Sequence, residues 1–260
     1  MTHAAPSRHP DDYPRVALVT GAAVRVGRAL ALDLAAKGWA VAVHHNRSSE
    51  AAADLVAAIE SAGGKAVALA ADFTEEAESA GLVDRVAAAL GPPGLLINNA
   101  STFEQDLVEN VTRESWDRHL EPNLRAPFLL CQSFAANLGA AAGGLIVNIL
   151  DERVLNLRSD YVSYSLSKAG LWALTQSLAV ALAPRIRVNA IGPGYTLPER
   201  GGTQADFDAA TARLPLGRGT TPAEICEALH FLLACKSITG QMIVLDGGHH
   251  LAGRRRNEGL

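Results

Sequence analysis

Tyr164 and Lys168 are the two side chains whose types and spacing best suit proton chemistry. They are four residues apart in a segment with helical periodicity, so they lie one turn apart on the same helix face. A lysine ammonium there can lower the pKa of the phenol toward neutrality, and it can also hold the ribose of a nicotinamide nucleotide. The pair therefore predicts a proton donor beside a hydride acceptor.

A glycine-containing turn upstream predicts the nucleotide site that this chemistry needs. Residues 20–27 (TGAAVRVG) join the first apolar run to a helix-like segment. Gly21 permits a tight turn, and Gly27 lets the helix pack close to the sheet, so that the helix N-terminus can meet a pyrophosphate. Two glycines alone are weak evidence, but their position directly after the first apolar run strengthens it.

The residues after the second apolar run predict which nicotinamide nucleotide is bound. In a Rossmann unit an acidic residue here would bind the ribose hydroxyls of NAD, but residues 44–48 (HHNRS) contain none. Arg47 and Ser48 offer a cation and a hydroxyl, and Arg25 adds a second cation, which suits a 2′-phosphate. We therefore expect NADPH to be preferred over NADH. The alternative is that Arg47 is only a solvated loop charge.

Further candidates follow the third and fourth apolar runs. Asp72 can accept a hydrogen bond from the adenine amino group, and the segment 98–101 (NNAS) can face the adenosine. The predicted cofactor residues of this half of the chain are Gly21, Arg25, Val26, Gly27, Asn46, Arg47, Ser48, Asp72, Phe73, Asn99, Ala100 and Ser101.

The elements that must position these residues alternate along the whole chain. Strands are predicted at 15–20, 40–44, 65–70, 94–97, 144–150, 186–191 and 242–245, and helices at 24–37, 50–61, 75–90, 113–138, 161–183 and 222–234. Strands that are apolar throughout, separated by helices, indicate a parallel sheet covered on both faces. The expected fold class is therefore α/β, a single-domain Rossmann-type doubly wound parallel sheet.

The expected domain occupies residues 13–251, with a disordered N-terminal segment at 1–12 and a C-terminal tail at 252–260. Residues 197–218 form the one long irregular insertion, rich in glycine and proline, where a mobile lid could sit.

Composition excludes several classes of function. With 260 residues, 48% hydrophobic residues and a net charge of −4, nothing favours nucleic acid or an anionic membrane as a partner. The longest uncharged apolar stretch, 169–183, is too short to span a bilayer. Three unclustered cysteines suggest reduced thiols and a cytoplasmic location. The histidine pairs 44–45 and 249–250 predict no metal site, because adjacent histidines rarely point at one ion.

Taken together, these motifs make the chain resemble a short-chain dehydrogenase/reductase of the classical single-domain type, from about residue 15 to residue 251. The resemblance is carried by the glycine turn, 98–100 (NNA), Asn123, 164–168 (YSLSK), Pro193-Gly194 and 246–248 (DGG).

This resemblance implies roles for further residues. Asn123 would support a water that relays protons from Lys168, Pro193 and Gly194 would line the nicotinamide, and Thr196 would contact the carboxamide or the phosphates.

The resemblance also implies an assembly, a homotetramer in which the helices at 113–138 and 161–183 supply a four-helix dimer interface. The arginines at 254–256 are expected to form a solvated tail. The alternative is that one of them reaches a neighbour's active site.

Two departures from the usual pattern bear on the substrate. Arg25 stands where the family usually has a glycine, and Asp151 stands where it usually has a catalytic serine, thirteen residues before the tyrosine. A carboxylate would repel a developing alkoxide, which disfavours ordinary ketone reduction. Beside Tyr164 it suits a nitrogen heterocycle instead. Protonated, Asp151 can donate toward a ring nitrogen. Ionised, it can hold the tyrosine hydroxyl or accept from an amino group.

Both departures occur together in pteridine reductases, which this sequence resembles. The matching features are the Gly21–Gly27 turn with Arg25, the Arg47-Ser48 pair, 98–103 (NNASTF), and the set Asp151, Tyr164 and Lys168. This implies hydride transfer from NADPH to an imine carbon of a pterin ring, with Tyr164 protonating the adjacent nitrogen. Phe103 would stack on the pterin. The alternative is that Phe103 packs a loop. A tyrosine expected after 246–248 appears as His249.

The predicted catalytic residues are thus Asn123, Asp151, Tyr164 and Lys168, and the predicted substrate residues are Ser101, Phe103, Asp151 and Tyr164. In this half of the chain the predicted cofactor residues are Tyr164, Lys168, Pro193, Gly194 and Thr196. Two other functions remain open. One is a short-chain reductase acting on an unrelated carbonyl or imine. The other is a non-catalytic NADP-binding sensor, which would usually lack part of the proton relay that is present here.

Overall fold

The computed structural model describes residues 13–139, 142–199 and 201–252. Its centre is one sheet of seven strands in the order β3-β2-β1-β4-β5-β6-β7, and every neighbouring pair is parallel. The predicted Rossmann-type sheet is confirmed. The strands are β1 (Val16–Val19), β2 (Ala40–His45), β3 (Lys65–Ala70), β4 (Leu95–Asn98), β5 (Gly144–Ile149), β6 (Ile186–Pro193) and β7 (Met242–Leu245).

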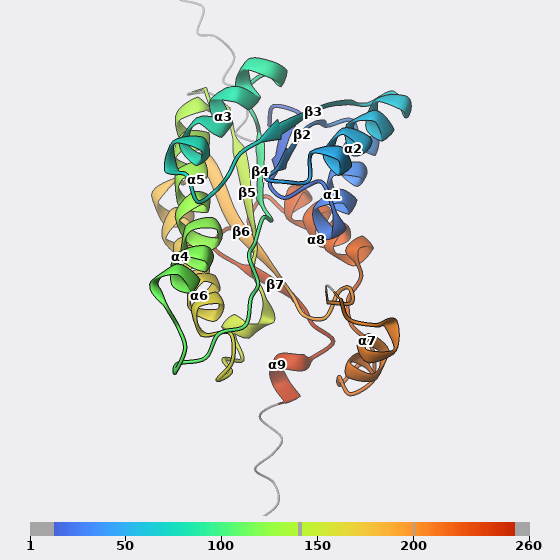
Figure 1. The fold of residues 1–260 in the computed structure, drawn as a ribbon. Coiled ribbons are helices and arrows are strands. Elements are labelled where there is room, and N and C mark those ends of the chain that lie inside the picture. The colour runs from blue at the N-terminus through green and yellow to red at the C-terminus, as the bar shows by residue number, and fades with distance from the viewer. Residues whose placement is uncertain (1–12, 140–141, 200, 253–260) are drawn as a thin grey trace, which may run out of the picture.

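Helices cover both faces of the sheet (Figure 1). One face carries α1 (Arg25–Ala36), α2 (Ser49–Ser61) and α8 (Pro222–Ala234), and the other carries α3 (Glu76–Leu90), α4 (Arg113–Leu120), α5 (Ala126–Asn137) and α6 (Val162–Ala181). Two short helices, α7 (Gln204–Thr211) and α9 (His249–Ala252), lie beyond the lower end of the sheet.

The continuous apolar strands are explained by two separate cores. In β1, Ala17 and Val19 belong to the core on the α1 side, whereas Val16 and Leu18 belong to the core on the α5 side. Alternate residues of a strand point to opposite faces, so a strand buried on both faces needs apolar residues at every position.

None of the helices in the described segments is long and apolar enough to cross a membrane.

The prediction of one continuous helix at 113–138 is wrong in the middle of that range. The chain forms α4, then a π-helical turn at Glu121–Arg125, and then α5. Pro122 lies in this turn and has no N–H to donate to the preceding turn, which favours the wider i→i+5 arrangement. Residue spacing alone cannot distinguish such a turn from a continuous helix.

The insertion at 197–218 is not irregular throughout, because it contains α7. Thr203 caps this helix by accepting from the backbone N–H of Asp206, whose side chain reaches back to the Thr203 backbone. That Thr-x-x-Asp spacing was a readable helix start. Ala252, predicted to begin the tail, ends α9 instead. The expectations for residues 1–12 and 253–260, including the arginines at 254–256, lie outside the described residues.

Candidate active site

The predicted site residues are brought to one edge of the sheet. They lie in the segments at and after the carboxyl ends of β1 to β6, in the π turn that holds Asn123, and in the first two turns of α6. The strand order reverses at β1, whose neighbours β2 and β4 lead to opposite halves of the sheet. Open α/β sheets bind their ligands in the crevice at such a point.

Asp151, Tyr164 and Lys168 form one group, in which Tyr164 and Lys168 are buried and Asp151 is partly exposed. The Tyr164 hydroxyl donates to Asp151 Oδ2 at 2.7 Å, and the backbone N–H of Arg153 donates to Asp151 Oδ1 at 2.9 Å. The Lys168 ammonium donates to the Ile149 carbonyl at 2.8 Å, at the end of β5. Asp151 therefore accepts on both oxygens, and its contact with Tyr164 is that of a carboxylate holding a phenol.

The expectation that Lys168 lowers the pKa of the phenol is wrong in this arrangement. Burial, and then the Asp151 carboxylate, raise the pKa of Tyr164 well above its ordinary value. The Lys168 Nζ lies 5.8 Å from the tyrosine ring centroid, whereas the carboxylate contacts the hydroxyl directly. Burial lowers the pKa of Lys168 to about 8. Tyr164 is therefore held as a protonated phenol.

These pKa shifts predict the pH dependence of the site. Lys168 is an ammonium below about pH 8 and loses its proton as the pH rises through that value. We expect reductase activity to fall above about pH 8, with no tyrosinate from Tyr164 below pH 10. Ultraviolet difference spectra between the wild-type chain and Tyr164→Phe measure that tyrosinate. A tyrosinate midpoint near neutral pH would contradict the prediction.

Asn123 lies in the π turn between α4 and α5, fully buried. Its Oδ1 accepts from the Thr102 backbone N–H at 2.8 Å, and its Nδ2 donates to the Thr102 carbonyl at 2.9 Å and to Ser167 Oγ at 3.0 Å. Both amide protons are thus used. The role predicted for Asn123, to support a water that relays protons from Lys168, stays a prediction.

Phe103 stacks on Tyr161, the residue that directly precedes α6. Its ring lies parallel to that of Tyr161, with centroids 4.3 Å apart, and meets the ring of Tyr164 edge-on at 4.7 Å. The Arg153 guanidinium lies 4.8 Å from the Tyr161 ring centroid. Phe103 remains 41% exposed, so part of its ring is open to a ligand.

A buried hydrogen-bond chain that the sequence did not reveal fixes the loop carrying Phe103. Ser163 Oγ donates to the Asp106 carboxylate, and the Ser163 backbone N–H donates to the other oxygen at 3.1 Å. His119 Nε2 accepts from the Glu104 backbone N–H at 3.0 Å, and His119 Nδ1 lies 2.8 Å from Ser163 Oγ. The serine hydroxyl is directed at the carboxylate, so this Asp, His and Ser set is structural and not a nucleophilic triad.

The glycine turn is packed too tightly for any other residue at its second glycine. A Cβ at Gly27 would lie 2.3 Å from the Gly21 carbonyl oxygen and 2.7 Å from Asn99 Nδ2. The Asn99 amide donates to the Thr20 carbonyl at 2.8 Å, and Thr20 Oγ1 accepts from the backbone N–H groups of Asn99 and Ala100. Thr20 was not among the predicted residues, yet it joins the turn to the end of β4.

Two site residues have backbones in the left-handed region, which favours glycine. Arg25 has φ 53° and Tyr161 has φ 55°, and no other non-glycine residue of the described segments has positive φ. Such strain persists where the surrounding structure requires it, often at functional sites. The positive φ of Arg25 is consistent with the glycine that the family usually has at this position, because glycine adopts such a φ without strain. Its guanidinium donates to the Pro198 carbonyl at 3.0 Å and so contacts the 197–218 insertion.

The segment after β2 lies beside the segment after β3. Hydrogen bonds from Thr74, and more weakly from Asn46, together with the charge of Arg47, lower the pKa of the Asp72 carboxyl. Arg47 and Ser48 are exposed. The cation and hydroxyl predicted to bind a 2′-phosphate are therefore accessible, next to the carboxylate predicted to bind adenine.

The remaining predicted cofactor residues lie near the ends of β6 and α1. A Cβ at Gly194 would lie 2.9 Å from Asp246 Cβ, which explains why the Pro-Gly and Asp-Gly-Gly motifs occur together. Thr196 Oγ1 donates to the Gly194 carbonyl at 3.0 Å. Val26 lies in the first turn of α1, and no side chain caps that helix N-terminus.

A second charged cluster, also not foreseen, adjoins Asp151. Glu152 accepts from Arg158 at 2.8 Å, and His249 Nδ1 lies 3.2 Å from the same oxygen. Burial raises the pKa of Glu152 to about 7, although Arg158 opposes the shift. His249, in the place expected for a tyrosine, stacks on Tyr195 with centroids 5.4 Å apart. In the described segments, no group of three or more His, Cys, Asp or Glu residues could hold a metal ion.

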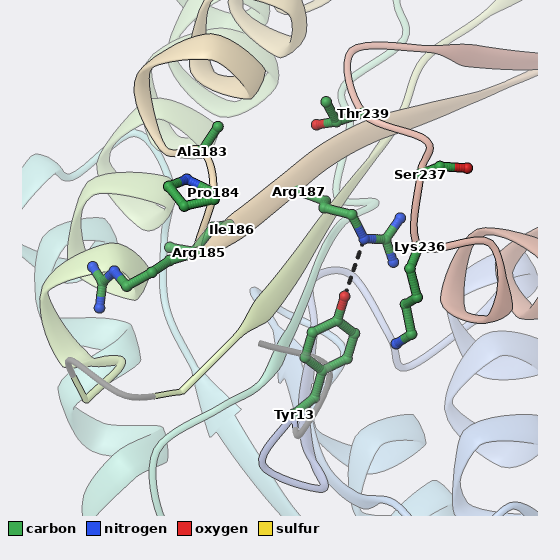
Figure 2. A pocket seen from close by; sticks show the side chains of 9 residues that line it. All are labelled: Tyr13, Ala183, Pro184, Arg185, Ile186, Arg187, Lys236, Ser237 and Thr239. Atoms are coloured by element: carbon green, nitrogen blue, oxygen red, sulfur yellow. Dashed lines mark hydrogen bonds between the residues drawn. The ribbon is translucent and has the colours of Figure 1, made fainter. Parts of the chain in front are cut away.

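One cavity lies away from this site, at the amino ends of the strands. It has a volume of about 230 Å³ and is lined by residues before β1 and β7 and around the start of β6, among them Tyr13, Lys236 and Arg187 (Figure 2). Arg187 donates to Tyr13 Oη and to the carbonyls of Leu232, Cys235 and Ile238. Its hydrogen-bonding capacity is thus largely used within the chain.

Comparisons with known proteins agree on the class of enzyme. The family model described as enoyl-(acyl carrier protein) reductase matches residues 21–250. The chain is 36% identical over 242 residues to an uncharacterized oxidoreductase of Methylorubrum extorquens, covering 90% of this chain and 97% of the relative. It is 37% identical over 241 residues to the cis-4-hydroxycyclohexanecarboxylate dehydrogenase of Sinomonas cyclohexanicum, covering 90% and 96%.

Among solved structures, the chain is similar to FolM alternative dihydrofolate reductase 1 from Brucella suis in complex with NADP. The TM-score is 0.89 and the sequence identity 43%, over 94% of this chain and 97% of that chain.

Proposed function

The chain belongs to the short-chain dehydrogenase/reductase family, and we propose that it reduces a pterin or a similar flat nitrogen heterocycle with NADPH. It is an NADP-dependent oxidoreductase of the classical single-domain type. The observation that carries the substrate class is the Asp151–Tyr164 hydrogen bond of 2.7 Å, at the place where a serine usually serves ketone reduction. The similarity to NADP complexes of FolM proteins supports it.

The residues present fit the cofactor. Gly21 and Gly27 keep the turn compact, and the uncapped N-terminus of α1 leaves backbone N–H groups for a pyrophosphate. Arg47 and Ser48 would hold the 2′-phosphate, and Lys168 the nicotinamide ribose. Bound NADPH supplies the hydride.

The chain's own contribution is to place and deliver a proton. Tyr164, held protonated by burial and by Asp151, donates its proton to the ring nitrogen next to the carbon that accepts the hydride. The resulting tyrosinate beside a carboxylate is unfavourable, which drives its reprotonation from the Lys168 side. Asp151 accepts throughout, and its free lone pairs can receive a ring amino group.

Phe103 supplies a platform for the flat ring. Tyr161 covers one face of it, so the heterocycle would use the part of the ring that stays exposed. Aromatic rings prefer such offset stacking at separations of a few ångströms. Ser101, two residues earlier and also exposed, would contact both substrate and cofactor.

The test is NADPH consumption with dihydrobiopterin, dihydromonapterin and dihydrofolate as substrates and simple ketones as controls. We expect turnover of at least one of the three heterocycles and little turnover of the ketones. Turnover of ketones alone would overturn the proposal and favour the alternative, a short-chain reductase for an unrelated carbonyl. No turnover of any substrate, despite NADPH binding, would favour a sensor.

Asp151→Ser should separate the two reductase functions. Loss of a charge-assisted hydrogen bond to Tyr164 and to a substrate amino group is expected to lower heterocycle turnover by about 10–100-fold. Ketone turnover should stay equal or rise, because a hydroxyl can hydrogen-bond a carbonyl. Improved ketone reduction with heterocycle turnover unharmed would contradict the pterin assignment.

Arg47→Ala should change which cofactor is preferred. Losing a charged contact to the 2′-phosphate is expected to raise KM for NADPH by about 10–100-fold, while KM for NADH stays within about twofold. The matched control is Arg113→Ala, which removes an exposed arginine of α4 that pairs with Asp117 on the same helix. An equal change in KM for NADPH and for NADH would show that Arg47 is merely a solvated charge.

We also propose that the protein works as a cytoplasmic homotetramer. The three cysteines, Cys131, Cys226 and Cys235, are free thiols. On α6, Leu166 and Val180 are exposed apolar side chains on a helix expected at the dimer interface. Light scattering of the purified chain would measure the assembly, and a monomer would refute it.

A further inference from the structure

His44, near the end of β2, joins two segments of the nucleotide site. The Gly21 backbone N–H donates to its Nδ1 at 3.0 Å, and its Nε2 lies 3.1 Å from the Ala71 carbonyl oxygen. Its ring stacks on Phe73, with centroids 4.2 Å apart and planes 7° from parallel. One buried imidazole thus contacts both the glycine turn after β1 and the segment after β3.

These two contacts fix the tautomer of the ring. Nδ1 accepts a hydrogen bond from the Gly21 N–H, so Nδ1 carries no proton itself, and Nε2–H must donate to the Ala71 carbonyl oxygen. Burial lowers the pKa of His44 to about 4, with a smaller contribution in the same direction from His45 and Arg85. A proton on Nδ1 would also face the Gly21 N–H. The ring therefore adds no charge at working pH.

The position of His44 gives this neutral ring a consequence for nucleotide binding. The Gly21 turn must present the N-terminus of α1 to a pyrophosphate, and Asp72 and Phe73 follow directly on Ala71. Both segments would contact the same dinucleotide, so their relative placement must be set before it binds. Preorganisation of this kind improves affinity because less ordering is needed on binding.

We propose that His44 is a positioning residue for the cofactor: its two hydrogen bonds hold the glycine turn and the segment after β3 in one arrangement and so set the affinity for NADP+. This rests on NADP being the cofactor and not on the pterin assignment. It also gives the first residue of the 44–45 histidine pair a structural task other than metal binding.

The test compares NADP+ titration calorimetry of three variants in the absence of substrate. His44→Phe keeps an aromatic ring against Phe73 but leaves the Gly21 N–H without its acceptor, and we expect Kd to rise about tenfold. His44→Asn keeps an acceptor near the place of Nδ1, so its Kd for NADP+ should rise less than that of His44→Phe. His45→Phe is the matched control, because the side-chain contact of His45 is a local one, from Nδ1 to the neighbouring Asn46 carbonyl oxygen at 3.1 Å, and the Kd of this variant should stay within about twofold.

Histidine ¹⁵N NMR of the wild-type chain gives an independent readout. It should show one ring with an unprotonated Nδ1 and a protonated Nε2 that stays neutral down to about pH 4. A folded His44→Phe with unchanged Kd, or a protonated Nδ1 in that ring, would overturn the proposal. If His44→Phe does not fold, the Asn variant and the tautomer decide. Because no substrate is present, failure of the pterin assay leaves this result standing.

Discussion

Replacing Tyr164 with phenylalanine is expected to lower turnover of the heterocycle by about 1000-fold while leaving the affinity for NADP+ within about threefold. The variant removes one oxygen atom, the hydroxyl that donates to Asp151 at 2.7 Å. It keeps the ring, which is buried against Phe103. Steady-state kinetics and cofactor titration of the same preparation measure the two quantities.

The size of the effect follows from the surroundings of that hydroxyl. Asp151 accepts hydrogen bonds on both oxygens, so it is not placed to donate a proton to the substrate. Lys168 spends one N–H on the Ile149 carbonyl and is expected to use the others on the nicotinamide ribose and the return of the proton to Tyr164, which leaves the Tyr164 hydroxyl as the donor. General acid catalysis contributes about 10²–10⁴-fold in enzymes, and loss of the donor removes that factor.

Tyr161→Phe is the matched control for Tyr164→Phe. It removes a phenol oxygen from the same aromatic cluster, three residues earlier, and keeps the ring stacked on Phe103. We expect its turnover to stay within about threefold, as for most changes that remove no buried or catalytic contact. If Tyr164→Phe retained a tenth of wild-type turnover, or if turnover fell equally in both variants, Tyr164 would not be the proton donor.

The order of strands and helices was predictable because strands buried on both faces are apolar at nearly every position. Runs such as Val16–Val19 and Gly144–Ile149 are apolar at nearly every position, and each is found as a strand within a residue or two of the predicted ends. Local rules also determine the glycine turn. Its two glycines are separated by the distance that a turn and the first helical turn require.

The details that escaped prediction depend on contacts between distant residues. The π turn at Glu121–Arg125 is the exception, because it contains Pro122, a local signal that apolar periodicity alone does not use. His44 and Gly21 are 23 residues apart, and Asp106 and Ser163 are 57 apart. No local pattern marks these pairs, because they become neighbours only when the sheet forms.

The pKa of Tyr164 illustrates the same limit in the chemistry. The Tyr164–Lys168 spacing places a cation near the phenol, which predicts a lowered pKa. Burial and Asp151, thirteen residues earlier, act in the opposite direction and are stronger. The spacing thus predicts that the two side chains are neighbours, whereas the direction of the pKa shift depends on which partner the hydroxyl contacts.

Gly27→Ala is expected to lower the free energy of unfolding by about 2–3 kcal/mol and to weaken NADP+ binding at least 100-fold. The added Cβ would lie 2.3 Å from the Gly21 carbonyl oxygen and 2.9 Å from Ala22 Cα, both backbone atoms. Backbone cannot rotate away as a side chain can, so α1 must shift from the turn. That shift moves the helix N-terminus that would hold the pyrophosphate.

Gly81→Ala isolates this clash from the ordinary effect of alanine in a helix. Gly81 lies inside α3, and a Cβ there would have nothing within 4 Å. Alanine is favoured over glycine in a helix by about 0.5–1 kcal/mol, so this variant should be more stable than the wild-type chain. Gly27 also lies in a helix, α1, and gains the same propensity. Denaturant unfolding gives the free energy of unfolding of both variants. The difference between Gly27→Ala and Gly81→Ala therefore measures the steric conflict in the turn.

Cofactor titration of the same two variants decides what the turn is for. If the compact turn serves only packing, Gly27→Ala loses stability but binds NADP+ normally once folded. If it positions the helix N-terminus for the dinucleotide, affinity falls by far more than stability predicts. The Gly27 Cβ would also lie 2.7 Å from Asn99 Nδ2, in the segment expected to face the adenosine, so the same displacement disturbs two parts of the nucleotide site. We therefore expect the second outcome, and normal affinity in a folded Gly27→Ala would refute it.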